Sequence, residues 1–277
     1  QKQATPCIVS EIPLVATGVE AEAARTTGRL VIAKNDGEVV KADAKKIVIK
    51  GAKGEDKYSL VTYSRTNNFT AFHQRPVVDV GQKVKKGDLL ADTSSSAQGQ
   101  IALGQNAFIA FMSWGGANYE DAIIISERLV RNSKFTSIHI EEFAVNVRDT
   151  KLGPEITTHD IPNVGEGRLK NLDEDGVIKV GAEVYPNDIL VGKITPKGET
   201  ELTPEERLLR SIFGEKSRDV KDSSLRMEHG KRGRVIGVRV FSRDRGDKLE
   251  SGIIKKIYIE VAQLRNISVG DKLAGRY

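Results

Sequence analysis

Two adjacent carboxylates, Glu120 and Asp121, have the clearest potential for chemistry in this sequence. They lie between two apolar runs, residues 108–112 and residues 122–125. A carboxylate beside a buried strand is costly unless a cation compensates it, so we expect a lysine, an arginine or a nucleotide-bound Mg²⁺ nearby. From the sequence alone, simple surface exposure at the start of a strand explains the pair equally well.

A second candidate is Lys272, which lies with Arg276 in a run of small residues. Gly270, Ala274 and Gly275 let a backbone approach a ligand closely, while the two cations reach phosphate oxygens. A short glycine loop with a lysine is weak evidence by itself.

A third candidate is the basic cluster Lys231-Arg232-Gly233-Arg234 beside His229, which has the composition of a contact with a nucleic-acid backbone. A charge run is usually a solvated face, and we favour that interpretation. The sequence contains no lysine-ended phosphate loop, no nucleophile elbow and no HExxH motif. It therefore gives little support to a self-contained enzyme.

An amphipathic helix is predicted at about residues 204–213. Thr203 is a suitable N-cap, Pro204 suits the first helical position, and Gly214 ends the helix. Its apolar stripe consists of Leu208, Leu209, Ile212 and Phe213. Such a stripe usually packs on its own domain. Here polar turns on both sides place the helix at the tip of a projection, where a binding partner is the second interpretation.

The elements that must position these residues are mainly strands. Short β-branched runs alternate with glycine, asparagine and aspartate turns, which predicts a mainly β fold with a few short helices. The predicted strands include residues 30–33, 47–49, 123–125, 189–191, 235–240 and 253–261.

One internal repeat stands out, because residues 77–90 recur as residues 177–190 with valines, glycines, aspartates and leucines aligned. Gly81 and Gly181 fall where a turn needs positive φ. We therefore expect a barrel-sandwich hybrid module to occur twice. Chance recurrence of such a pattern in a β protein is the alternative.

Composition restricts the class of protein. The 277 residues are 39% hydrophobic, enough for real cores, and the 43 basic residues exceed the 38 acidic ones by only five charges. The single cysteine, Cys7, forms no intramolecular disulfide and lacks metal-ligand spacing. Neither a signal peptide nor a long apolar run occurs, so we expect a cytoplasmic protein without a membrane partner.

Four segments closely resemble bacterial RNA polymerase β subunits. Residues 118–128 and 148–155 are similar to active-site segments of that family, and residues 160–166 and 192–216 to its flap. The resemblance covers essentially the whole chain. The chain is expected to be an internal piece of a longer subunit, because it opens without a methionine.

The resemblance implies a division into three segments. Residues 1–140 correspond to the active-site-proximal, hybrid-binding portion, a double-psi barrel region with a barrel-sandwich segment at about 30–95. Residues 141–255 correspond to the flap, a further barrel-sandwich module inserted there, which walls the RNA exit channel. Residues 256–277 correspond to the return strand and loop. The short turn at 242–252 predicts a compact flap.

The resemblance also implies nucleotidyl transfer by a DNA-directed RNA polymerase, with this piece inactive alone. Glu120 and Asp121 match an acidic pair near the incoming nucleotide and the second Mg²⁺. Lys272 matches a lysine on RNA phosphate near the 3′ end, and Gln3 a glutamine that touches RNA. The catalytic Mg²⁺ is expected on aspartates of the β′ subunit, so no residue here is expected to hold metal directly.

The stripe Leu208, Leu209, Ile212 and Phe213 matches the flap-tip helix that docks σ region 4 and elongation and termination regulators. Other expected partners are the β′ and α subunits, template DNA, nascent RNA and nucleoside triphosphates, in a nucleoid-associated complex. Two departures from the family bear on the hybrid contact, because Leu264 replaces a second phosphate-contacting lysine and Asn266 a basic residue. Tyr277 replaces a histidine and residues 113–117 replace a proline-containing loop, which a divergent lineage or a paralogue would explain.

Two other classes of protein stay open on the residues alone. Biotinyl and lipoyl carrier modules share the barrel-sandwich pattern and expose a lysine on a hairpin, for which Lys45 in Asp43-Ala44-Lys45 is the candidate. The other class is a purely structural binding module without polymerase chemistry.

Overall fold

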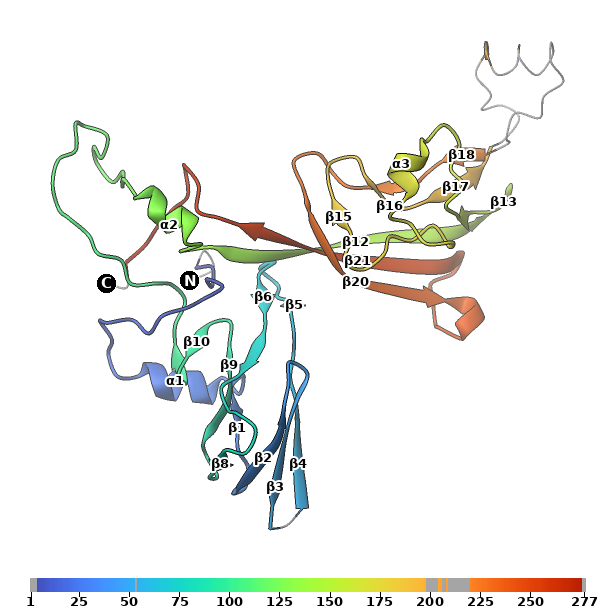
Figure 1. The fold of residues 1–277 in the computed structure, drawn as a ribbon. Coiled ribbons are helices and arrows are strands. Elements are labelled where there is room, and N and C mark those ends of the chain that lie inside the picture. The colour runs from blue at the N-terminus through green and yellow to red at the C-terminus, as the bar shows by residue number, and fades with distance from the viewer. Residues whose placement is uncertain (1–3, 53, 198–203, 206–207, 209–219, 276–277) are drawn as a thin grey trace. The chain divides into compact units, whose positions relative to one another are not determined.

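A computed structural model describes residues 4–52, 54–197, 204–205, 208 and 220–275 (Figure 1). Strands dominate these residues, so the predicted mainly β fold is confirmed. The described α-helices are short: α1 (Glu20–Thr26), α2 (Glu127–Arg131) and α3 (Glu166–Leu169). The chain divides into two compact units. The first combines residues up to Ile140 with those from Leu264 onward, and the second is Glu141–Gln263.

The first unit is built on an antiparallel sheet with the strand order β4-β3-β2-β8. These strands are β2 (Gly37–Ala42), β3 (Lys46–Gly51), β4 (Gly54–Ser59) and β8 (Lys83–Val84). A second sheet has the order β1-β9-β7, from β1 (Val31–Ile32), β9 (Leu89–Thr93) and β7 (Gln74–Pro76). Val39, Ile47, Ile49, Val84 and Leu90 form much of the core that both sheets share.

Two strand pairs complete the first unit. One joins β5 (Ser64–Arg65) to β6 (Ala71–Phe72), and the other joins β10 (Ser96–Ala97) to β11 (Gln100–Ile101).

The second unit contains a five-stranded sheet with the order β13-β12-β21-β20-β15. Its members are β12 (Ser137–Thr150), β13 (Gly153–Pro154), β15 (Glu183–Val184), β20 (Gly233–Ser242) and β21 (Ile253–Arg265). Alternate residues of β21, among them Ile257 and Ile259, enter the core beside Val235 and Val261. This is the two-residue periodicity of a sheet with one buried face.

Two smaller sheets cover the rest of that unit. One has the order β14-β17-β18, from β14 (Ile156–Thr157), β17 (Lys193–Pro196) and β18 (Val220–Asp222). The other pairs β16 (Ile189–Val191) with β19 (Leu225–Arg226). The β20–β21 connection contains the short 3-10 helix Arg243–Arg245.

The predicted repeat has the same backbone hydrogen bonds in both copies. Gly81 and Gly181 have φ of 88° and 93°, as predicted, and each closes a turn. The Gly81 N–H donates to Val39 O at 2.7 Å, and the Gly181 N–H donates to Val235 O at 2.8 Å. The residue after each glycine accepts in return from that valine's N–H at 2.9 Å. Each turn is thus docked on a neighbouring strand.

A second turn in each copy is also reproduced. Asp88 Oδ2 accepts from the Lys85 N–H, and Asp188 Oδ2 accepts from the Tyr185 N–H, both at 2.8 Å. Gly87 and Asn187 both have positive φ. Chance recurrence therefore does not explain the repeat, although the barrel-sandwich and double-psi assignments remain predictions.

The repeat extends to the strands that receive the turns. Val84 pairs with Gly37 of β2, and Val184 pairs with Gly233 of β20. A Cβ on Gly37 would lie 2.7 Å from Lys50 O, and one on Gly233 would lie 2.5 Å from Ala262 O. Glycine is required at both positions because the neighbouring strand passes too closely for a side chain.

The prediction of a strand at residues 123–125 is wrong. Residues 102–126, the green loop between β11 and α2 in Figure 1, form neither helix nor strand. The apolar runs are exposed rather than buried, with Phe108 and Phe111 at 105% and 97% of full exposure. A β-branched run becomes a strand only beside a hydrogen-bonding neighbour, and no described strand pairs with this one.

The predicted tip helix lies mostly outside the described residues. Pro204, Glu205 and Leu208 are helical, and the Leu208 side chain is exposed. Leu209, Ile212 and Phe213 lie outside the described part of the chain. No helix within the described ranges has the length and apolar character that a membrane crossing requires.

Candidate functional site

Asn118 holds the loop that carries the acidic pair. Its Oδ1 accepts from the Trp114 N–H at 3.0 Å, and its Nδ2 donates to Met112 O at 2.7 Å. We call these two hydrogen bonds the Asn118 bracket. Gly115 and Gly116, both with positive φ, let the chain turn between them. Both ends of one amide are used, which neither aspartate nor alanine can reproduce.

The bracketed turn presents Glu120 and Asp121 to solvent. Glu120 has a left-handed backbone with φ of 59°, and both side chains are exposed. Neither carboxylate forms an ion pair within the described residues. The compensating protein cation expected from the sequence is therefore not found there, and the arrangement matches the alternative of surface exposure.

Lys272 lies on a turn that sequence reasoning did not relate to the repeat. Gly270 has φ of 93°, and the Asp271 N–H donates to Ser268 O at 3.2 Å. The Gly81 and Gly181 turns close with the same bond at the same 3.2 Å. The signal was available as Val269-Gly270-Asp271-Lys272-Leu273 beside Val80-Gly81-Gln82-Lys83-Val84.

Lys272 itself is exposed and forms no ion pair with any residue that the structure describes. The acidic pair and Lys272 belong to the first unit but make no hydrogen bond with one another. Chemically, the two loops offer carboxylate oxygens and a separate ammonium group. Gln3 and Arg276 lie outside the described residues.

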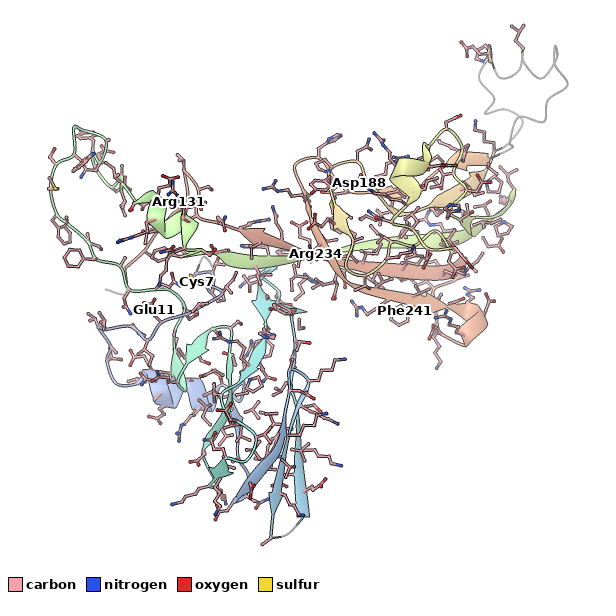
Figure 2. The ribbon with its side chains drawn as sticks, viewed as in Figure 1. Cys7, Glu11, Arg131, Asp188, Arg234 and Phe241 are labelled. Atoms are coloured by element: carbon pink, nitrogen blue, oxygen red, sulfur yellow. The ribbon has the colours of Figure 1, made fainter. Side chains whose placement is uncertain are left out.

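The basic cluster is largely neutralised by its own unit. Lys231 lies 2.7 Å from Glu141 and 2.8 Å from Glu228, and hydrogen bonds to these two carboxylates raise its pKa. Arg234, labelled in Figure 2, pairs with Glu183 at 2.6 Å. These ion pairs favour the solvated-face interpretation over a phosphate contact.

A buried ion pair joins two segments that carried the resemblance. Lys193 Nζ lies 2.9 Å from Glu155 Oε2, and the two side chains are only 11% and 9% exposed. Burial alone raises the Glu155 pKa. Hydrogen bonds from Lys193, from the Arg148 N–H and from Thr195 outweigh burial and hold that pKa below its ordinary value. This pair has a structural role that sequence reasoning missed.

The first unit also contains a cavity of about 100 Å³, lined in part by Cys7, Tyr63, His73 and Arg75. The Tyr63 and His73 rings stack with centroids 4.3 Å apart. The buried Nδ1 of His73 has no hydrogen-bond partner among the residues described. Burial, and then the charge of Arg75, lower the His73 pKa, and burial raises the pKa of the Cys7 thiol.

One departure from the resembled family has a structural counterpart. Asn266, at a position where the resemblance predicts a basic residue, accepts through Oδ1 from the hydroxyl of the fully buried Thr136 at 3.1 Å. Leu264 is exposed.

Within the described ranges, no three histidine, cysteine, aspartate or glutamate side chains converge. Mg²⁺ commonly binds one or two carboxylates together with water and substrate phosphates, so Glu120 and Asp121 fit an accessory contact to a nucleotide-bound ion.

Comparisons with known proteins agree on one family. Residues 32–277 match the family model described as RNA polymerase Rpb2, domain 6. Over its full length the chain is 56% identical to the DNA-directed RNA polymerase subunit beta of Syntrophomonas wolfei and 57% identical to that of Dehalococcoides mccartyi. It spans 25% and 22% of those proteins, about a quarter of the length of the curated relatives it matches.

Proposed function

The chain belongs to the RNA polymerase β-subunit family, and from that membership we propose that it forms part of the β subunit of a DNA-dependent RNA polymerase. Identity of 56% over the whole chain carries the proposal. The activity is nucleotidyl transfer in a complex with the β′ and α subunits, template DNA and nascent RNA, located in the cytoplasm at the nucleoid. The carrier alternative has no support in these relatives.

In this proposal Lys272 contacts an RNA phosphate near the growing 3′ end. Supporting it, the ammonium group is exposed and has no ion pair within the described residues, so no protein carboxylate offsets its charge. A lysine acts as a point charge towards phosphate. Gln3 supplies a further RNA contact.

Glu120 and Asp121 act at the incoming nucleoside triphosphate. Their exposure on a bracketed loop supports this role, since an accessory carboxylate must reach a substrate-bound ion without its own protein cation. A nucleotide-bound Mg²⁺, held mainly by β′, would supply charge neutralisation at the phosphates, with Glu120 and Asp121 as accessory contacts. The residues of this chain orient the nucleotide and the RNA end.

Residues 141–255 are the flap, which walls the RNA exit channel and docks σ region 4 and the elongation and termination regulators. The exposed, helical Leu208 supports this assignment. An apolar helix face is a usual anchor for a partner helix. Leu209, Ile212 and Phe213 complete the proposed docking stripe.

The catalytic part is tested with the full-length subunit assembled into polymerase. Lys272→Gln is expected to slow extension of an RNA primer at saturating nucleotide by about tenfold, the loss of one charge-assisted contact. Glu120→Gln with Asp121→Asn is expected to raise the KM for nucleotide. Lys83→Gln changes the exposed lysine of a matching turn and serves as the control. Wild-type kinetics in both active-site variants would contradict the proposal.

The docking part is tested by binding of σ region 4 at about 0.15 M salt, where surface charge attraction is largely screened. Leu208→Glu, alone and with Phe213→Glu, is expected to abolish binding. Val180→Glu replaces another exposed apolar residue of the same unit and is expected to leave binding unchanged. Equal binding by all variants would remove the flap-tip assignment.

A further inference from the structure

We propose that Asp271 is a positioning residue for Lys272, an inference that rests on the proposed contact between Lys272 and RNA phosphate. Asp271 Oδ2 accepts from the Ser268 N–H at 2.8 Å and lies 3.4 Å from the Ser268 hydroxyl. The Asp271 N–H donates to Ser268 O at 3.2 Å. The carboxylate therefore closes the turn directly before Lys272 by a second route, which we call the side-chain clamp.

The two copies of the repeat show what the clamp does. Gln82 forms the same clamp in the first copy, where its Oε1 accepts from the Asp79 N–H at 3.1 Å. Ala182 lacks a side-chain acceptor in the second copy, yet that turn closes in the same way. The turn at Gly181 is docked on β20 through Val235, so it keeps its shape without a clamp.

The Lys272 turn differs from both copies in its surroundings. Within the residues that the structure describes, Gly270 donates no backbone hydrogen bond to a strand, whereas Gly81 and Gly181 both do. Among the described residues, the clamp is consequently the hydrogen bond that holds this turn besides its own backbone bond. Without Asp271, the three residues before Lys272 regain backbone freedom, and Lys272 loses its fixed direction.

The clamp also determines the charge available at Lys272. Asp271 is the nearest carboxylate in sequence, but its oxygen is engaged by Ser268 and forms no ion pair with Lys272. The ammonium group remains free to meet an incoming anion. A carboxylate released from the clamp is free to compete with the RNA phosphate for it.

The test uses the full-length subunit in assembled polymerase, paused on a preformed RNA–DNA hybrid. Single-nucleotide extension is measured across nucleotide concentrations for Lys272→Gln, Asp271→Ala, Asp271→Asn and the Asp271→Ala/Lys272→Gln pair. Gln82→Ala removes the same clamp from a turn that is docked on a strand and is the matched control. Asp271→Glu, which moves the acceptor by one methylene, replaces Asp271→Ala should that variant not assemble.

Asp271→Ala is expected to slow extension at saturating nucleotide by about fivefold to tenfold, with the KM for nucleotide changed by less than about twofold. Asp271→Asn restores most of the rate, since its Oδ1 still accepts from the Ser268 N–H. The double variant is no slower than Lys272→Gln alone, and Gln82→Ala matches the wild type.

Two results overturn the inference while leaving the proposed function intact. One is a wild-type rate for Asp271→Ala when Lys272→Gln is slow, and the other is a double variant that multiplies the two single losses. A wild-type rate for Lys272→Gln has a different meaning, because it removes the proposed phosphate contact itself and the inference with it.

Discussion

Glu155 and Lys193 form a buried ion pair between the start of β14 and the start of β17, with 2.9 Å between Oε2 and Nζ. Lys193 also donates to Asn146 O, and Glu155 accepts from the Arg148 N–H and the Thr195 hydroxyl. Both carboxylate oxygens of Glu155 accept hydrogen bonds, and the Lys193 ammonium group donates two. The pair thereby joins β12 to β17 through charged contacts inside the second unit.

Removing one partner of this pair is expected to lower the free energy of unfolding far more than removing both. Lys193→Met leaves a buried carboxylate without its cation, which we expect to destabilise the unit by about 3–5 kcal/mol. Lys193→Met with Glu155→Leu should recover most of that loss. Hydrogen exchange of the amides in Ile189–Val191 measures the stability of both variants. Arg234→Met breaks an exposed pair and should cost less than about 1 kcal/mol; an equal effect of Lys193→Met would contradict the argument.

Gly37 and Gly233, which lie against the backbone of a neighbouring strand, should tolerate no side chain. Gly37→Ala and Gly233→Ala place a methyl group against backbone of the neighbouring strand, and we expect each to cost about 1–3 kcal/mol. Gly167 in α3 has open space around its Cα, so Gly167→Ala should be neutral or slightly stabilising. Thermal unfolding of the three variants gives the comparison. Similar melting temperatures for all three would contradict this, because they would show that the neighbouring strand moves away from the added methyl group at little cost.

Asn118 should matter through both ends of its amide. Asn118→Asp keeps the acceptor for the Trp114 N–H but loses the donor to Met112 O, whereas Asn118→Ala loses both. In assembled polymerase we expect the KM for nucleotide to rise about fivefold and about thirtyfold respectively, at about 1 kcal/mol per bond. Asn35→Ala removes one exposed hydrogen bond to Asp56 in the same unit and should have no effect. Equal kinetics for Asn118→Asp and wild type would show that the hydrogen bond to Met112 does not position the acidic pair.

His73 should make stability depend on pH near neutrality. Its folded pKa is lowered by burial and by Arg75, so the unfolded chain takes up the proton first. The contribution of neutral His73 is fully present above about pH 6.5 and is lost as the pH falls towards the lowered folded value. His73→Phe keeps a ring to stack on Tyr63 and cannot titrate. Urea unfolding at pH 7.5 and 5.5 should therefore show a smaller loss of unfolding free energy at the lower pH for this variant than for the wild type. An equal loss in both proteins would mean that other groups cause it.

The sequence predicted the regular part of the fold through local signals. β-branched runs became strands at β3, β16, β20 and β21, and Gly81 and Gly181 adopted the positive φ that a turn of this type needs. These features depend on neighbours in the chain, which a sequence displays directly.

Features that depend on distant neighbours were missed or wrong. The run 123–125 has the composition of a strand but no described partner. Glu155 and Lys193 are 38 positions apart, so nothing local indicated their contact. The exposed positions of Glu120, Asp121 and Lys272 follow from loops whose hydrogen bonds involve Asn118 and Asp271, residues for which the sequence indicated no role.

The repeat has a consequence for how such a chain diverges. Val84 and Val184 stay buried, while the outward neighbour is Lys83 in one copy and Glu183 in the other. A turn of this kind changes its electrostatic character by single substitutions that leave the core untouched. Lys272 holds the same place after its own glycine, but there the next residue, Leu273, is exposed, so the charge at that turn is set without a core to protect.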